Sequence, residues 1–229
     1  MDPILILYAT REGHTHRIAD HIAELLCAHG LPVEQRDARN IKEPFDCSGY
    51  AAAILAASVH LQHHEREMVR FVKRHRDALE RLPSAFLSVS LSEAGAEADA
   101  VSPERRARSA ADVDRMLSGF FHETGWHPDR VSPVAGALRY TKYGLLLRWI
   151  MKRKARKAGA STDTSRDHAL TDWEGLDRFI TAFMHLLPHT EDAPAAHSDP
   201  AARPGSAPKE QKDQKDRPDS DGASRGRPA

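Results

Sequence analysis

Short apolar runs alternate with longer stretches of helical periodicity along this chain. Residues 4–9 form a continuous apolar run, which predicts a strand buried on both faces. Further short strands are predicted at 31–36, 50–57, 84–89 and 130–135, and helices are predicted over 15–29, 65–79 and 102–124. A last helix is predicted to start from a capping box formed by Thr171 and Glu174 and to end at Pro188.

Strands that alternate with helices favour an α/β fold, a parallel sheet with helices on both faces. Five such units predict a flavodoxin-like, doubly wound five-stranded sheet with the order 2-1-3-4-5. Ligands of such sheets bind beyond the carboxyl ends of the strands, where the strand order reverses. The relevant loops are then expected at 10–15, 58–64 and 88–96. Pro133 predicts that the fifth strand lies near an edge of the sheet.

The first of these loops carries hydroxyl groups and a glycine directly after the first strand. Backbone N–H groups at the start of the following helix can bind an anion, and Thr10 and Thr15 add hydroxyl donors. Gly13 lets the backbone come close to a ligand. The Thr-x-x-Gly-x-Thr spacing resembles the FMN-phosphate loop of flavodoxins, whereas the dinucleotide and Walker patterns are absent from this loop. The alternative is an ordinary strand–turn–helix start that binds no ligand.

The other two loops have less specific sequences. Three histidines lie within 60–64, and Glu65 and Glu67 follow them. They follow no standard ligand spacing, so we expect no metal site; they are either exposed loop histidines or part of a segment that packs on a flavin ring. The small, hydroxyl-rich stretch 88–92 either binds the polar edge of a planar ring or is a serine-rich strand end.

Charge and composition divide the chain unevenly. The 33 Lys and Arg balance the 33 Asp and Glu, yet residues 139–157 carry eight Lys and Arg and no acid. Residues 188–229 contain no Ile, Leu, Val, Phe, Tyr, Trp or Met, which predicts a disordered tail, because such a segment cannot bury enough apolar surface to offset its ordering entropy. We therefore expect one folded domain at 1–187, with a long basic insertion at 137–170, and a tail at 188–229.

The basic insertion suits an anionic bilayer surface, because apolar residues recur at helical spacing beside its lysines and arginines. The candidate membrane contacts are Leu145, Leu146, Trp149, Ile150, Lys152, Arg153 and Lys154. The alternative is a solvated helix whose apolar side packs on the body. Nucleic acid is disfavoured as a partner, because no binding motif accompanies this single patch.

The chain has no basic signal region at its start and no stretch of about 20 apolar residues. Its two cysteines have no metal-site spacing and indicate a reducing compartment. A cytoplasmic protein, peripherally associated with the inner face of the cell membrane, is therefore expected.

Several stretches together resemble one family, the flavodoxin-like, quinone-dependent protoporphyrinogen IX dehydrogenases. They lie at 10–15, 57–64, 71–75, 82–86, 136–140, 162–164 and 171–174. The resemblance extends over about residues 3–187 and keeps its order throughout. Its most specific part is Gly-Ala-Leu-Arg-Tyr at 136–140, with the later Thr-Asp-Thr and Thr-Asp-Trp-Glu.

The resemblance implies FMN as cofactor and the oxidation of protoporphyrinogen IX to protoporphyrin IX in haem synthesis. Electrons would pass to a membrane quinone, menaquinone or ubiquinone. The implied cofactor-binding residues are Thr10, Arg11, Glu12, Gly13, His14, Thr15, Ser58, Val59, His60, Ser88, Val89 and Ser90.

Cations are needed for the two propionates of the porphyrinogen, and Arg139, Lys142 and Arg148 are the candidates. No catalytic base is evident from the sequence. A quinone reductase or an FMN electron carrier without porphyrinogen activity is the alternative function.

Overall fold

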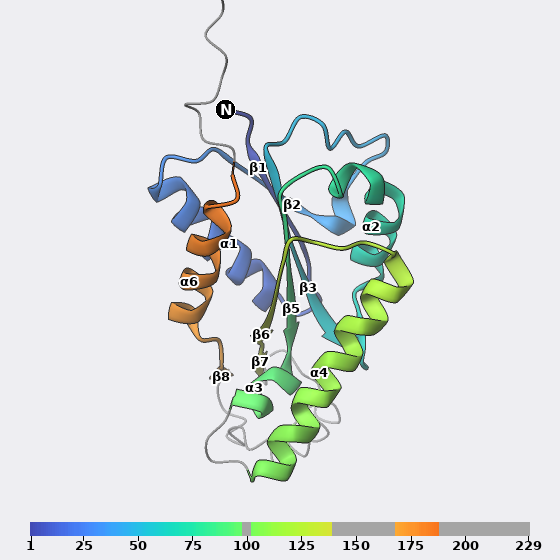
Figure 1. The fold of residues 1–229 in the computed structure, drawn as a ribbon, viewed down its shortest axis with the longest axis vertical. Coiled ribbons are helices and arrows are strands. Elements are labelled where there is room, and N and C mark those ends of the chain that lie inside the picture. Colours follow the sequence, from blue (N-terminus) through green and yellow to red (C-terminus); the bar gives the residue numbers. More distant parts are fainter. Residues whose placement is uncertain (98–101, 139–167, 188–229) are drawn as a thin grey trace, which may run out of the picture. The chain divides into compact units, whose positions relative to one another are not determined.

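The computed structural model describes residues 1–97, 102–138 and 168–187. Five parallel strands form the centre of the fold, in the order β2-β1-β3-β5-β6 (Figure 1). The strands are β1 (Ile4–Ala9), β2 (Val33–Asp37), β3 (Ala52–His60), β5 (Ser84–Ser90) and β6 (Arg130–Ala135). When only the parallel strands are numbered, this order is the predicted 2-1-3-4-5. Pro133 lies in β6, at one end of this order, as predicted for an edge strand.

Two helices cover each face of the sheet (Figure 1). The helices α1 (His14–Ala28) and α6 (Trp173–Met184) pack on one face, and α2 (Arg66–Leu79) and α4 (Pro103–Thr124) pack on the other. Successive side chains of a strand point to opposite faces, so Ile4 and Ile6 pack under α1 and α6, whereas Leu5 and Leu7 pack under α2 and α4. All four are fully buried, which is why the run reads as continuously apolar.

Short elements that the sequence did not predict occupy two of the three expected loops. Residues 58–60 are the end of β3, and Val59 and His60 pair through a two-residue turn with the antiparallel β4 (His63–His64). Residues 88–90 are the end of β5, which runs directly into α3 (Leu91–Glu97). The prediction of loops at 58–64 and 88–96 is therefore wrong, and each site segment is held in regular structure.

The two differences have separate explanations. Leu61 and Gln62 form the turn between β3 and β4 with φ values of 49° and 67°, and neither is the Asn or Gly that usually marks such a turn. At α3, the Ser90 hydroxyl oxygen accepts a hydrogen bond from the Glu93 N–H at 3.2 Å and so caps the helix. The Ser-x-x-Glu spacing of this pair is a capping pattern that could have predicted α3.

The start of α6 also differs from the prediction. Asp172, not Thr171, is the N-cap residue, and its carboxylate accepts a hydrogen bond from the Gly175 N–H at 3.0 Å. The Thr171 hydroxyl instead donates to the Ala135 carbonyl at the end of β6, at 2.7 Å. Thr171, which the local pattern predicts as the cap, therefore forms a tertiary hydrogen bond with Ala135 instead.

The described residues also contain three further short elements. They are the 3₁₀ helix η1 (Ala38–Asn40) and the strands β7 (Ala137–Leu138) and β8 (His168–Ala169), which pair antiparallel. The predicted insertion lies outside the described residues apart from its two ends, and so does the predicted tail. The substrate and membrane candidates Arg139, Lys142, Leu145, Leu146, Arg148, Trp149, Ile150, Lys152, Arg153 and Lys154 therefore lie outside as well. Among the helices that are described, none combines the length and the apolar character that a membrane crossing requires.

Candidate cofactor-binding site

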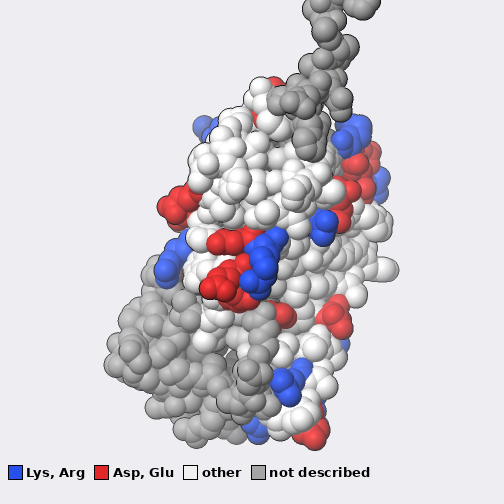
Figure 2. Space-filling model, turned by 60° about the vertical axis from the view of Figure 1, so that its left-hand side comes forward, with Lys and Arg blue, Asp and Glu red and all other residues white. Residues whose placement is uncertain are grey.

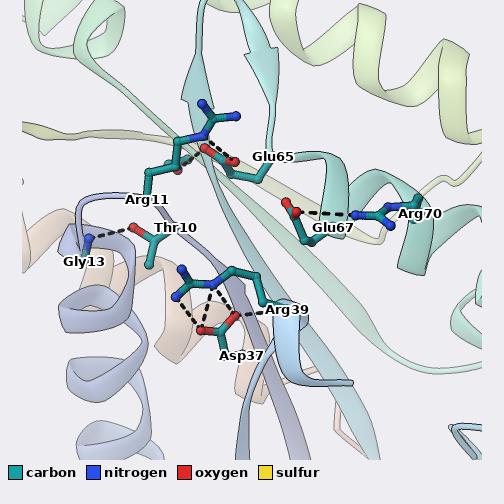
Figure 3. A network of polar contacts seen from close by, with 9 residues as sticks. Thr10, Arg11, Gly13, Asp37, Arg39, Glu65, Glu67 and Arg70 are labelled. Carbon is teal, nitrogen blue, oxygen red and sulfur yellow. Dashed lines mark hydrogen bonds and ion pairs between the residues drawn. The ribbon is translucent and has the colours of Figure 1, made fainter. Parts of the chain in front are cut away.

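The loop between β1 and α1 forms a cradle at the carboxyl end of the sheet. Gly13 adopts φ 83°, a left-handed conformation that glycine reaches without steric cost. Its N–H donates a hydrogen bond to Thr10 Oγ1 at 3.0 Å, which closes the turn (Figure 3). The first N–H groups of a helix have no acceptor within the helix itself and lie at the positive end of its dipole. This loop can therefore hold an anion.

Thr15 supplies an observation that tests whether an acceptor group fits here. Its side chain is fully buried, and among the described residues its hydroxyl has no hydrogen-bond partner. A buried hydroxyl left in this state costs about 1–3 kcal/mol. An acceptor oxygen bound at the start of α1 would remove this cost, and a flavin phosphate offers such oxygens next to backbone N–H donors. The residues of the cradle thus fit the phosphate end of FMN.

His14 joins the cradle to the C-terminal part of the described chain. Its Nε2 lies 2.8 Å from Thr171 Oγ1. Because the hydroxyl proton of Thr171 is donated to Ala135, Nε2 carries the proton of the second bond and donates it. The cradle, the end of β6 and the start of α6 are therefore joined by one short chain of hydrogen bonds.

A buried carboxylate joins the cradle to β3. Glu65 is 5% exposed, and its Oε2 accepts a hydrogen bond from Arg11 Nε at 2.9 Å (Figure 3). Its Oε1 accepts a hydrogen bond from the Ser58 hydroxyl at 3.3 Å, and its N–H donates to the Ser58 carbonyl at 3.1 Å. The sequence did not identify Glu65 as a site residue, since Arg11 lies 54 positions away and no local pattern links the two.

The two other arginines labelled in Figure 3 have acidic partners too. Arg39 Nη2 lies 2.7 Å from Asp37 Oδ2, and Arg70 Nη2 lies 3.4 Å from Glu67 Oε1. On the face drawn in Figure 2, basic and acidic side chains of the described residues likewise lie beside one another. The described part of that face therefore carries no large patch of one sign.

The end of β3 reaches the same edge of the sheet as the cradle. Ala9 of β1 pairs with Ala57 of β3, so Ser58 follows at the level of Thr10. Ser58, Val59 and His60 are all partly exposed. The turn that follows carries Leu61 at its tip, 72% exposed. Three candidate residues thus lie at the predicted edge, on a strand rather than on a loop.

The end of β5 is more deeply buried. Ser88 is fully buried and its hydroxyl lies 2.9 Å from His64 Nε2, whereas Val89 belongs to the core under α1 and α6. Ser90 caps α3, and its carbonyl accepts a hydrogen bond from the Gly136 N–H at 2.9 Å. The side chains of Ser88, Val89 and Ser90 are therefore already in contact with other residues of the protein.

His64 is a core side chain on the short strand β4. Its ring contacts Phe86 and Phe120, with ring centres at 5.3 and 4.8 Å. Burial, with a smaller contribution from the neighbouring His63, lowers the pKa of His64 to about 4. The ring is therefore neutral at physiological pH. No cluster of His, Cys, Asp or Glu side chains suited to a metal ion occurs in the described ranges.

Comparisons with known proteins agree with the fold. Residues 5–165 match the family model for the flavodoxin domain, so the class of protein is that of the flavodoxin-domain proteins. A protoporphyrinogen IX dehydrogenase (quinone) from Escherichia coli strain K12 is 34% identical over 182 residues, which cover 80% of this chain and 94% of that protein. The protein of the same name from Leishmania major is 30% identical over 184 residues, covering 80% and 74% of the two chains.

This chain belongs to the flavodoxin-like family of the protoporphyrinogen IX dehydrogenases (quinone), as the matched length and identity show. Among solved structures, oxidised Flavodoxin 1 from Bacillus cereus is similar, with a TM-score of 0.46 and 17% identity over 81% of this chain and 99% of that one.

Proposed function

We propose that this protein is an FMN-dependent oxidoreductase that oxidises protoporphyrinogen IX to protoporphyrin IX, in haem biosynthesis, and passes the electrons to a membrane quinone. The buried Thr15 hydroxyl at the start of α1 carries the cofactor part of the proposal, since it lacks a partner in the described residues and a phosphate oxygen would provide one. The names and identities of the relatives support the substrate and the acceptor.

In this proposal the cradle holds the FMN phosphate, and two strand ends hold the ring. The cradle residues are Thr10, Arg11, Glu12, Gly13, His14 and Thr15, and the ring contacts are Ser58, Val59, His60, Ser88, Val89 and Ser90. Because Ser88 and Val89 have buried side chains, β5 contributes mainly its backbone near Ser90. FMN bound here would supply the redox chemistry that links oxidation of the substrate to reduction of the quinone, while the protein binds and orients it.

In this proposal the basic insertion binds the substrate and contacts the membrane. Arg139, Lys142 and Arg148 bind the propionates, and the apolar and basic residues at 145–154 contact an anionic membrane from the cytoplasmic side. Changing Lys152, Arg153, Lys154, Arg156 and Lys157 to Glu is expected to abolish sedimentation with anionic vesicles. Unchanged sedimentation would show that the membrane contact is wrong.

We also propose that residues 1–187 form the folded domain and that 188–229 is a disordered tail. Limited proteolysis is expected to remove the tail first and to leave FMN binding intact. A fragment that loses FMN together with the tail would contradict this division of the chain.

The purified protein tests the function directly. Its visible absorption spectrum should show a flavin, and the chromophore released by denaturation should be FMN. An anaerobic assay should then show oxidation of protoporphyrinogen IX that depends on added quinone. Quinone reduction without porphyrinogen oxidation would favour the alternative, a flavodoxin-like quinone reductase or electron carrier. A colourless protein that takes up no added FMN would refute both.

A further inference from the structure

Glu65 combines features that a surface ion pair does not have. Its carboxylate is 5% exposed, whereas the side chain of its cationic partner Arg11 is 55% exposed. A buried carboxylate is expensive unless charged and hydrogen-bonding partners satisfy it. Glu65 finds those partners in two separate parts of the site, the Arg11 guanidinium from the cradle and the Ser58 hydroxyl from the end of β3.

The position of Glu65 explains why it can join these parts. It directly precedes α2, and its backbone is fixed at both ends: its N–H donates to Ser58, and its carbonyl accepts from Met68 and Val69 in the first turn of the helix. The carboxylate is thus held by a helix and a strand. The cradle loop reaches toward it through Arg11 (Figure 3).

Arg11 retains binding capacity in this arrangement. Its contact with Glu65 uses Nε, and four of the five N–H donors of a guanidinium are on the two Nη atoms. A long arginine side chain loses rotamer freedom when it binds a ligand, and an ion pair that orders it beforehand reduces that loss. The contact with Glu65 therefore restricts Arg11 and leaves its Nη donors available to a ligand.

We propose that Glu65 is a positioning residue that sets the cradle relative to the end of β3, so that the phosphate end and the ring end of one FMN molecule are bound together. The proposal rests on the flavin binding of the proposed function. FMN engages both ends of the site, whereas riboflavin lacks the phosphate and engages only one. If the two ends lose their relative position, the advantage of FMN over riboflavin falls, because the second contact no longer forms at a high effective concentration.

The test is the affinity of the full-length apoprotein for FMN and for riboflavin, each measured by quenching of flavin fluorescence. Glu65→Gln keeps the shape of the side chain and removes its charge. We expect this variant to bind FMN about tenfold more weakly, the effect of one lost charge-assisted contact, and to bind riboflavin as the wild type does. Glu67→Gln is the matched control, because Glu67 lies two residues along the chain and pairs with Arg70 on the surface. It should leave both affinities unchanged.

Arg11→Met provides a second route if Glu65→Gln does not fold, since Arg11 is largely exposed. It should lower the preference for FMN as well, and the double variant should be no weaker than Arg11→Met alone, because both changes break one contact. An unchanged ratio of the two affinities in Glu65→Gln would overturn the proposal, and so would an equal loss for both flavins or additive effects in the double variant. If the wild-type protein binds neither flavin, the proposed cofactor fails first and this inference fails with it.

Discussion

Replacing Thr15 by Val is expected to have opposite effects on the free protein and on the FMN complex. The two side chains have the same shape, so the substitution removes only the hydroxyl. In the free protein this hydroxyl is buried at the start of α1 without a partner among the described residues. The chain therefore bears a cost that a bound acceptor oxygen would remove.

The expected changes in stability and in FMN affinity both follow from the loss of the Thr15 hydroxyl. An unsatisfied buried hydroxyl costs about 1–3 kcal/mol, so Thr15→Val should raise the free energy of unfolding of the apoprotein by about 1 kcal/mol. A hydrogen bond to a charged phosphate is worth about 1.5–3 kcal/mol, so the affinity for FMN should fall roughly tenfold to a hundredfold. Stability and cofactor affinity therefore change in opposite directions.

Urea unfolding of the apoprotein and flavin fluorescence measure the two quantities. Thr124→Val is the matched control, because this buried threonine donates its hydroxyl proton to the Phe120 carbonyl at 2.8 Å and lies far from the cradle along the chain. It should lose about 1 kcal/mol of stability and bind FMN normally. If Thr15→Val also destabilised the apoprotein and bound FMN as tightly as the wild type, the Thr15 hydroxyl would not be a phosphate ligand.

Three further predictions concern the framework of the site. The pKa of His64 lies near 4 in the fold against about 6.5 in the unfolded chain, so the unfolded chain takes up the proton first as the pH falls. Urea unfolding should therefore show that the free energy of unfolding falls by about 3 kcal/mol between pH 6.5 and 4, and falls less in His64→Gln. Gln62→Gly should raise the free energy of unfolding by about 1 kcal/mol, because glycine accepts the φ of 67° without strain, and a lower melting temperature would contradict this. Asp172→Ala should lower the stability by about 1 kcal/mol through loss of the cap on α6, with Asp172→Asn close to the wild type in thermal unfolding.

The sheet could be predicted from the sequence because its signals are local. The apolar run at 4–9, the hydroxyl and glycine spacing of the cradle, and the periodicity of the helices each lie within one segment. Pro133 placed its strand at the edge because proline cannot donate to a sheet ladder. These are the features in which expectation and structure agree.

The remaining features depend on contacts between distant segments. The turn at Leu61 and Gln62 lacks the Asn or Gly that would mark a hairpin in the sequence. The strand β4 is held instead by the packing of His64 against β5. Thr171 matched a cap locally but is bound to Ala135 instead. The link between Arg11 and Glu65 joins two elements that only the folded sheet brings together.

The β7–β8 pair has a consequence for how this chain can be rearranged. Ala137 pairs with Ala169 and Leu138 with His168, so the chain leaves and re-enters the domain on adjacent strands, about 4.8 Å apart. Closing such a gap takes only a tight turn. A tight turn in place of residues 139–167 would therefore leave the ends of β7 and β8 at the same spacing, so the sheet could keep its geometry when this segment is shortened.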